Sequence, residues 1–139
     1  MAMSPSDPSF VPIAAGVIER SGRFLVARRQ AGAHAGGTWE FPGGKLRPGE
    51  GPLDALKREM EEEVGVQFRS AILLDVTEHA YPERTVLLHF FLCLEPQAEP
   101  EAREGQELRW VTLGEIESLE IPAANRGIVR LLAEQFGEG

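Results

Sequence analysis

Acidic side chains are concentrated in one stretch of the sequence, GGKLRPGEGPLDALKREMEEEVGV, which covers residues 43–66. Four of the five residues from 59 to 63 are glutamates, and Glu50 precedes them in a segment rich in glycine and proline. Like charges three or four residues apart on a helix repel one another. A divalent cation such as Mg²⁺ or Mn²⁺, which takes oxygen ligands, is one partner that could hold these carboxylates together.

The same stretch predicts a helix over residues 52–64. Pro52 suits the first turn of a helix, and Gly65 suits the position just after its end. An apolar stripe recurs at helical spacing and predicts the face that packs on the core. Its members are Leu53, Leu56, Met60 and Val64.

Three of the glutamates share one side of this helix. At about 100° per residue, Glu59, Glu62 and Glu63 lie beside the apolar stripe, so their carboxylates can converge. Glu61 lies nearly opposite and faces water. The alternative is an ordinary solvated acidic face, with pairs such as Arg58–Glu62 at a spacing of four residues.

The spacing of the whole stretch decides between these interpretations. From Gly44 to Val66 it follows G-x5-E-x7-R-E-U-x-E-E-x-G-U, where U is apolar, and every specified position matches. The stretch resembles the Nudix box, the signature of Nudix hydrolases. These enzymes use divalent metal to cleave a nucleoside diphosphate linked to another group. The resemblance implies a Nudix α/β/α sandwich in which the box forms a loop, a helix and a loop.

The resemblance also implies roles for individual residues. The implied metal ligands on the box are the carbonyl of Gly43 and the carboxylates of Glu59, Glu62 and Glu63, one of which serves as base. Arg58 is implied to orient a glutamate, and Glu50 to bind a second metal or fix the loop. Glu104, from an acidic loop, is implied as a further ligand or base. The implied cofactor is Mg²⁺ or Mn²⁺.

Segments outside the box extend the likeness over roughly residues 12–132. Four of these segments together resemble MutT-type Nudix enzymes: RRQAGAHAGGTWEFPGGK, EHAYPERTVLLHFFL, EGQELRWV and IPAANRGIV. Those enzymes hydrolyse 8-oxo-dGTP to the monophosphate and pyrophosphate, which removes oxidised nucleotides from the pool used for DNA synthesis. The likeness implies that Arg29 and His34 contact phosphate or sugar, and that Phe41 packs near the base. It further implies that Arg84 approaches the base and that Asn125 reads the purine edge.

Each of these assignments has an ordinary structural alternative. Arg29 suits a surface charge, His34 an exposed loop, Phe41 the core, Arg84 a turn, Asn125 a helix cap and Glu104 one more acid in an acidic loop. An amide such as that of Asn125 offers both donors and an acceptor, which favours the interpretation that it recognises a base.

Other functions within the superfamily also fit the sequence. Relatives that act on CTP or 5-methyl-dCTP share much of the flanking sequence, and the loop GGTW at 36–39 varies in the family. Dinucleoside polyphosphates, nucleotide sugars and RNA 5′ ends are further Nudix substrates. A non-catalytic Nudix domain that binds lesions or nucleotides is the alternative of a different class, but such domains usually lose box glutamates, and here every one is present.

Composition limits the class of partner. The chain has 139 residues, 42% of them hydrophobic, and a net charge of −8, which predicts one globular domain and argues against long nucleic acid as its partner. The longest apolar run, residues 86–94, is too short to span a membrane. Cys93 is the only cysteine and is predicted to be a core residue. We expect a cytoplasmic monomer or weak dimer without a secretory signal.

The remaining pattern predicts a flexible tail over residues 1–9 and a single domain over residues 10–139. Period-two and β-branched segments predict strands, and the last segment has an apolar helical face. Strands are expected at 10–20, 24–29, 39–41, 68–81, 84–95 and 107–111, and further helices at 113–119 and 123–136. The expected fold is α/β or α+β, with a mixed sheet between helices.

Overall fold

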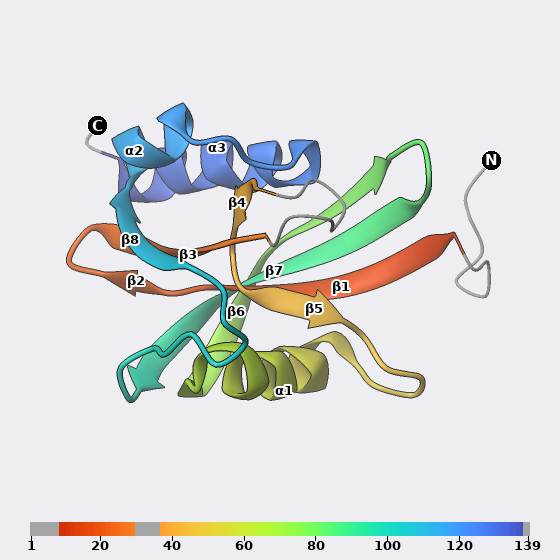
Figure 1. Cartoon of the computed structure of the whole chain (residues 1–139), viewed down its shortest axis with the longest axis horizontal. Coiled ribbons are helices and arrows are strands. Elements are labelled where there is room, and N and C mark those ends of the chain that lie inside the picture. The colour runs from red at the N-terminus through yellow and green to blue at the C-terminus, as the bar shows by residue number, and fades with distance from the viewer. Residues whose placement is uncertain (1–8, 30–36, 138–139) are drawn as a thin grey trace.

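The structure is a computed structural model that describes residues 9–29 and 37–137. Helix α1 covers one side of the sheets, and α2 and α3 cover the other (Figure 1), so the predicted α/β/α sandwich is confirmed. The elements in chain order are β1 (Phe10–Val17), β2 (Glu19–Arg20), β3 (Arg23–Arg28), β4 (Trp39–Glu40), β5 (Gly43–Lys45), α1 (Pro52–Val64), β6 (Gln67–Ala80), β7 (Thr85–Gln97), β8 (Leu108–Thr112), α2 (Leu113–Ser118), the 3₁₀ turn η1 (Ala123–Asn125) and α3 (Arg126–Phe136).

The strands form two sheets. The first has the order β5-β1-β7-β6, in which β1 and β7 are parallel and the outer pairs are antiparallel. The second is antiparallel: β3 pairs with β2, β4 and β8. The mixed sheet expected from the sequence is therefore present. In it β5 is an edge strand and pairs with β1, which lies nearer the centre.

Two details differ from the expected strands. The strand expected over 10–20 is interrupted at Ile18, and its two parts, β1 and β2, belong to different sheets. The Ile18 carbonyl accepts a hydrogen bond of 3.1 Å from the Leu25 N–H, so the chain turns there into the hairpin with β3. Strand β5 was not expected, because its two glycines carry little strand propensity and its pairing depends on the distant β1.

Helix α1 has the predicted bounds, and Gly65 ends it with a left-handed φ of 68°. Its buried face differs from the predicted stripe at two positions. Leu53, in the first turn, is 41% exposed, whereas Glu63 is only 9% exposed. Glu63 lies seven residues after Leu56, which is two turns of helix, and therefore shares its core-facing side.

Two apolar clusters fill the spaces between the layers. On the side of α1, Cys93 packs with Leu56, Met60 and Val64. Burial raises the pKa of its thiol to about 12, so the prediction of a core cysteine is confirmed. The opposite cluster contains residues of α3 and of both sheets, among them Phe24, Phe90, Ile128 and Leu132.

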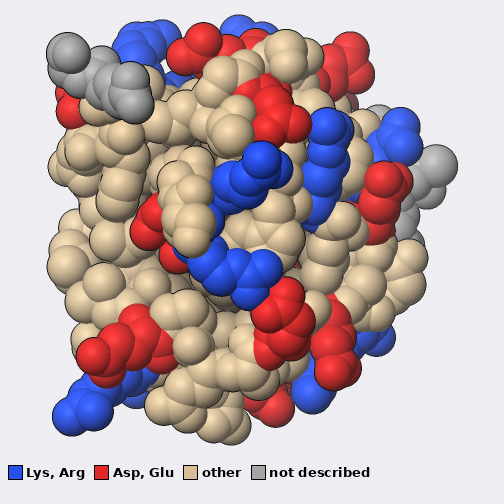
Figure 2. Space-filling view, turned by 90° about the vertical axis from the view of Figure 1, so that its left-hand side faces the viewer, with Lys and Arg blue, Asp and Glu red and all other residues tan. Residues whose placement is uncertain are grey.

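The described surface carries no large field of one sign on the side where β2 turns into β3. Figure 2 shows acidic and basic side chains interspersed over that face. Among the described residues, no helix is long and apolar enough to cross a membrane.

The tight pairing of β5 with β1 leads to a stability prediction. A Cβ on Gly43 would overlap the Ala14 carbonyl oxygen and lie 2.6 Å from the Ala15 Cα. We expect Gly43→Ala to lower the free energy of unfolding by about 1–3 kcal/mol, as overpacking does. Gly127 has open space around it in α3, so Gly127→Ala should raise the free energy of unfolding by about 0.4–1 kcal/mol. Urea unfolding measures both, and equal stability of Gly43→Ala and wild type would contradict the close approach.

Candidate active site

Strand β5 lies directly against the acidic side of α1. The Gly43 N–H donates a hydrogen bond of 2.9 Å to Glu63 Oε2. A Cβ on Gly44 would collide with the carboxylate of Glu59, so glycine is required for this close approach. Packing of β5 on α1 thus brings together Gly43, Glu59 and Glu63, three of the predicted metal ligands.

Arg58 joins the remaining acids of the box. Its Nε and Nη2 donate to both oxygens of Glu50 at 2.8 Å, and its Nη1 donates to Glu59 at 2.7 Å and to Glu62 at 3.3 Å. This paired guanidinium lowers the pKa of Glu50 to about 2, with the Arg47 N–H as a second cause. The role predicted for Arg58, which is to orient a glutamate, fits this geometry and stays a prediction.

Glu63 lies in an electrostatically unfavourable place for an anion. Burial raises its pKa to about 8; the Gly43 hydrogen bond opposes this shift, while the charges of Glu40, Glu104 and Glu59 add to it. A nearby hard cation relieves such repulsion and prefers carboxylate and carbonyl oxygens. The donor chemistry around Glu63 therefore fits Mg²⁺ or Mn²⁺.

The carboxylates are paired with Arg58 rather than arranged around one point. Within residues 9–29 and 37–137, no three His, Cys, Asp or Glu side chains gather at metal-ligand spacing. Glu59 points to Arg58, Glu62 is partly exposed, and Glu63 points to Gly43. Shared coordination of one ion by these residues requires Glu59 and Glu62 to turn away from Arg58.

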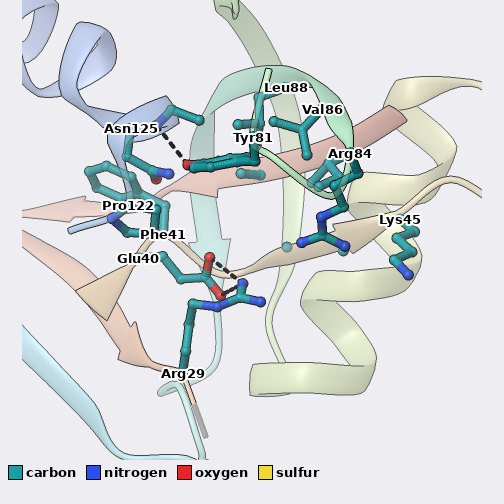
Figure 3. A pocket seen from close by; sticks show the side chains of 15 residues that line it. Arg29, Glu40, Phe41, Lys45, Tyr81, Arg84, Val86, Leu88, Pro122 and Asn125 are labelled. Atoms are coloured by element: carbon teal, nitrogen blue, oxygen red, sulfur yellow. Dashed lines mark hydrogen bonds and ion pairs between the residues drawn. The ribbon is translucent and has the colours of Figure 1, made fainter. Parts of the chain in front are cut away.

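Beside this cluster is a cavity of about 360 Å³. Its apolar wall comes from β1 and β7. Its polar groups come from β4, β5, η1, the β6–β7 turn and Arg29, which directly follows β3. Four of the five predicted substrate residues line it: Arg29, Phe41, Arg84 and Asn125 (Figure 3). The fifth, His34, lies outside the described residues.

Asn125 is placed to face this cavity rather than to cap α3. It stands at the N-cap position, but its side chain makes no capping hydrogen bond. The residue is only 5% exposed and lines the cavity wall. Phe41 belongs to the apolar core and also lines the cavity, and its contact with a base stays a prediction.

Arg84 presents an unsatisfied donor in the cavity wall. Its Nε is buried and has no hydrogen-bond partner among the described residues. A buried donor without an acceptor costs about 1–3 kcal/mol. A ligand that places an acceptor here would recover this free energy, and the role of Arg84 in binding it stays a prediction.

A second cavity, of about 440 Å³, connects the first to the acidic cluster. Glu63 and Glu104 line it, and Arg29, Glu40 and Gly43 line both cavities. Arg29 Nη1 lies 2.9 Å from each oxygen of Glu40 at the boundary. Burial raises the pKa of Glu40, and the charge of Arg29 opposes that shift. An elongated ligand can therefore extend from the apolar cavity to the carboxylates.

Two residues at this site were not predicted from the sequence. Glu40 stands in WEFPGGK between two aromatic residues, and that placement was its only signal. Gln106 is 9% exposed; its Nε2 donates 3.0 Å to the Glu63 carbonyl, and its Oε1 accepts 3.0 Å from the Glu104 N–H. Its amide thus fixes the loop that carries Glu104 to the end of α1.

The raised pKa of Glu63 leads to a prediction about stability and pH. The folded state holds the Glu63 proton more tightly than the unfolded state does. The contribution of this group to the free energy of unfolding is therefore fully present below the ordinary pKa of 4.5, and it is lost as the pH rises to about 8. In chelator, we expect the free energy of unfolding to fall by up to about 5 kcal/mol across that window. Glu63→Gln should flatten much of this slope, and the raised pKa of Glu40 should maintain a smaller slope of the same sign.

Urea unfolding at pH 5, 6.5 and 8 measures this slope. The pKa of Glu50 is lowered to about 2, so its contribution changes only below this range and does not interfere. A wild-type protein that is as stable at pH 8 as at pH 5 would contradict the strained placement of Glu63.

Comparison with known proteins agrees with this geometry. A family model described as NUDIX domain matches residues 14–131. A protein of Haemophilus influenzae named 8-oxo-dGTP diphosphatase is 38% identical over 130 residues, which are 92% of this chain and 96% of that protein. A CTP pyrophosphohydrolase of Escherichia coli is 32% identical over 123 residues, or 88% of this chain and 90% of the relative.

The solved structures that resemble this one have the same fold. A MutT from work on Aliivibrio salmonicida and Vibrio cholerae matches with a TM-score of 0.78 at 30% identity, over 91% of this chain and 98% of its own. The match of the family model includes the acidic box, the second half of β1 and the first half of α3. The chain therefore belongs to the Nudix family and is a Nudix hydrolase.

Proposed function

We propose that this hydrolase converts 8-oxo-dGTP and related oxidised purine nucleotides to the monophosphate and pyrophosphate, and so cleans the nucleotide pool. One observation carries the proposal: the amide of Asn125 is buried without capping its helix, in an apolar cavity that leads to the acidic cluster. A relative of 38% identity bears the name 8-oxo-dGTP diphosphatase.

In this proposal the base occupies the cavity of about 360 Å³. It stacks near Phe41, and Asn125 pairs with the purine edge. Guanine has an acceptor at N7, whereas the 8-oxo form has a donor there. In this proposal the amide oxygen of Asn125 faces N7, where it accepts from the 8-oxo form and finds no donor on guanine. The unsatisfied Nε of Arg84 donates to an acceptor on the nucleotide. A buried reader left unpaired by the wrong base gives strong discrimination.

The phosphates then extend past Arg29 and Glu40 to the acidic cluster. Arg29 gives up its ion pair with Glu40 and pairs with phosphate instead. His34 adds a contact to phosphate or sugar. The proposed ligands of Mg²⁺ or Mn²⁺ are Gly43 O, Glu50, Glu59, Glu62, Glu63 and Glu104. The metal, when bound, neutralises phosphate charge and acidifies water. One of the glutamates accepts the proton of the attacking water.

A second candidate is pyrophosphohydrolysis of CTP or 5-methyl-dCTP. The 32% identity to the CTP pyrophosphohydrolase of Escherichia coli favours it. For either function we propose one domain over residues 10–139, a cytoplasmic monomer or weak dimer, and no long nucleic acid as partner, since the net charge is −8. The tail predicted over residues 1–9 lies, apart from Ser9, outside the described residues.

A steady-state panel with Mg²⁺ tests the substrate. We expect kcat/KM for 8-oxo-dGTP to exceed that for dGTP by at least about a hundredfold, or ~2.7 kcal/mol, with monophosphate and pyrophosphate as products. CTP, 5-methyl-dCTP, a dinucleoside tetraphosphate and ADP-ribose complete the panel. Preference for CTP or its methylated form would replace the purine proposal with the second candidate.

Two neighbouring glutamates separate an enzyme from a nucleotide-binding module. We expect Glu62→Gln to reduce kcat by at least about a hundredfold because it removes a proposed metal ligand, while binding of the nucleotide monophosphate is retained. Glu61→Gln is the matched control, since Glu61 lies on the other side of α1 and pairs with Arg103; it should keep nearly full activity. Equal activity of the two variants would argue against the proposed metal site.

A further inference from the structure

We propose that Tyr81 is a positioning residue that holds Asn125 in the orientation needed to read the base. Its hydroxyl oxygen accepts a hydrogen bond of 2.9 Å from the Ala124 N–H, the residue directly before Asn125 (Figure 3). Tyr81 and Asn125 line the same cavity from different parts of the fold. The proposal rests on the proposed function of that cavity as a base site.

The hydrogen bond satisfies a backbone donor in η1, the 3₁₀ turn that leads directly into α3. The first N–H groups of a helix have no partner within it and need acceptors from elsewhere. Pro122 and Asn125 are the N-cap residues of η1 and α3, and neither provides a side-chain cap. The Ala124 N–H belongs to a residue that is 2% exposed. Tyr81 supplies its acceptor, and the amide of Asn125 is thereby left to face the cavity.

Tyr81 is itself firmly placed. Its N–H donates 2.7 Å to the Arg84 carbonyl, and the Arg84 N–H donates 3.3 Å back, which closes the turn between β6 and β7. The ring of His79 lies 4.5 Å from its ring, at an angle of 57°. The turn that carries Arg84 is therefore joined to the turn that carries Asn125, and the two polar groups on the cavity keep a fixed relative position.

This connection matters for selectivity more than for turnover. Hydrogen bonds weaken steeply as their angle and distance depart from the optimum. Without the hydroxyl, η1 is free to shift relative to the β6–β7 turn, and the amide of Asn125 loses its alignment with the base. The acidic cluster lies on α1 and β5, whereas the hydroxyl accepts its hydrogen bond from η1, so the chemical step should be unaffected.

The test is Tyr81→Phe, which removes one oxygen atom and keeps the ring. We expect its preference for 8-oxo-dGTP over dGTP to fall about tenfold, through KM, with kcat within about twofold of wild type. Direct titration with the two monophosphates should show the same loss of preference. Thr77→Val is the control: it removes a hydroxyl that donates to Asp75 on the same strand, away from the cavity, and should leave the preference unchanged.

Coupling to Asn125 distinguishes positioning from a general structural effect. In an Asn125→Ala background, Tyr81→Phe should have almost no further effect on the preference, because both changes remove the same interaction. Independent, additive losses would overturn the proposal, as would a Tyr81→Phe variant with undiminished preference.

A measurement without substrate keeps this inference separate from the proposed function. Amide hydrogen exchange at Ala124 should be faster in Tyr81→Phe than in wild type, and unchanged exchange would overturn the proposal.

Tyr81 is the only tyrosine of the chain, so 3-fluorotyrosine in otherwise native protein reports on it alone; its ¹⁹F signal should shift on nucleotide binding. If wild type prefers a pyrimidine, the purine proposal falls, and the preference lost in Tyr81→Phe is measured for that nucleotide.

Discussion

Repulsion among carboxylates at one end of α1 is the constraint on which the site depends. Three acids, Glu40, Glu59 and Glu104, act on the buried Glu63, and the surrounding structure is arranged to tolerate this. Arg58 donates hydrogen bonds to three carboxylates, and the Gly43 N–H donates one to Glu63. The adjacent Gly43 and Gly44 let the backbone approach α1 closely enough for this contact. The unfavourable charge has a chemical purpose, because a site with excess negative charge attracts divalent cations that a polyphosphate also needs.

In the proposed function, the two cavities and this charge distribution together favour binding of a complete nucleotide. The first cavity combines an apolar wall with two polar groups that can bind a ligand: Asn125, whose side chain makes no capping hydrogen bond, and Arg84, whose Nε has no partner among the described residues. The second cavity is lined by acids and arginines. The ion pair of Arg29 and Glu40 marks the boundary between them. In the proposed function a free base would fill only the first cavity and a free polyphosphate only the second, so the largest binding free energy is expected for a molecule that has both parts.

Much of this arrangement could be predicted from local sequence, and the rest depends on distant contacts. The box fixed the helix at 52–64 and its acids, since their spacing is a local property of a helix. Strand β5 escaped prediction because a Gly-Gly pair becomes a strand only when β1 is beside it. Gln106 was not predicted because one of its two hydrogen bonds is long-range. Its amide donates to the Glu63 carbonyl, 43 positions away, and accepts from the Glu104 N–H, two positions away. The burial of Glu63 followed from helical spacing and was missed because charged residues were assumed to lie beside the stripe, outside the core.

The buried sulfur atoms have a consequence for the durability of the protein. Within the described residues, the sulfur-containing side chains are Cys93 and Met60, which are 4% and 0% exposed. Peroxide attacks the thiolate, and a thiol with a pKa of about 12 is almost entirely protonated at neutral pH. The folded core therefore offers oxidants little to react with, and a catalyst of this construction keeps its packing under the chemical stress that damages nucleotides.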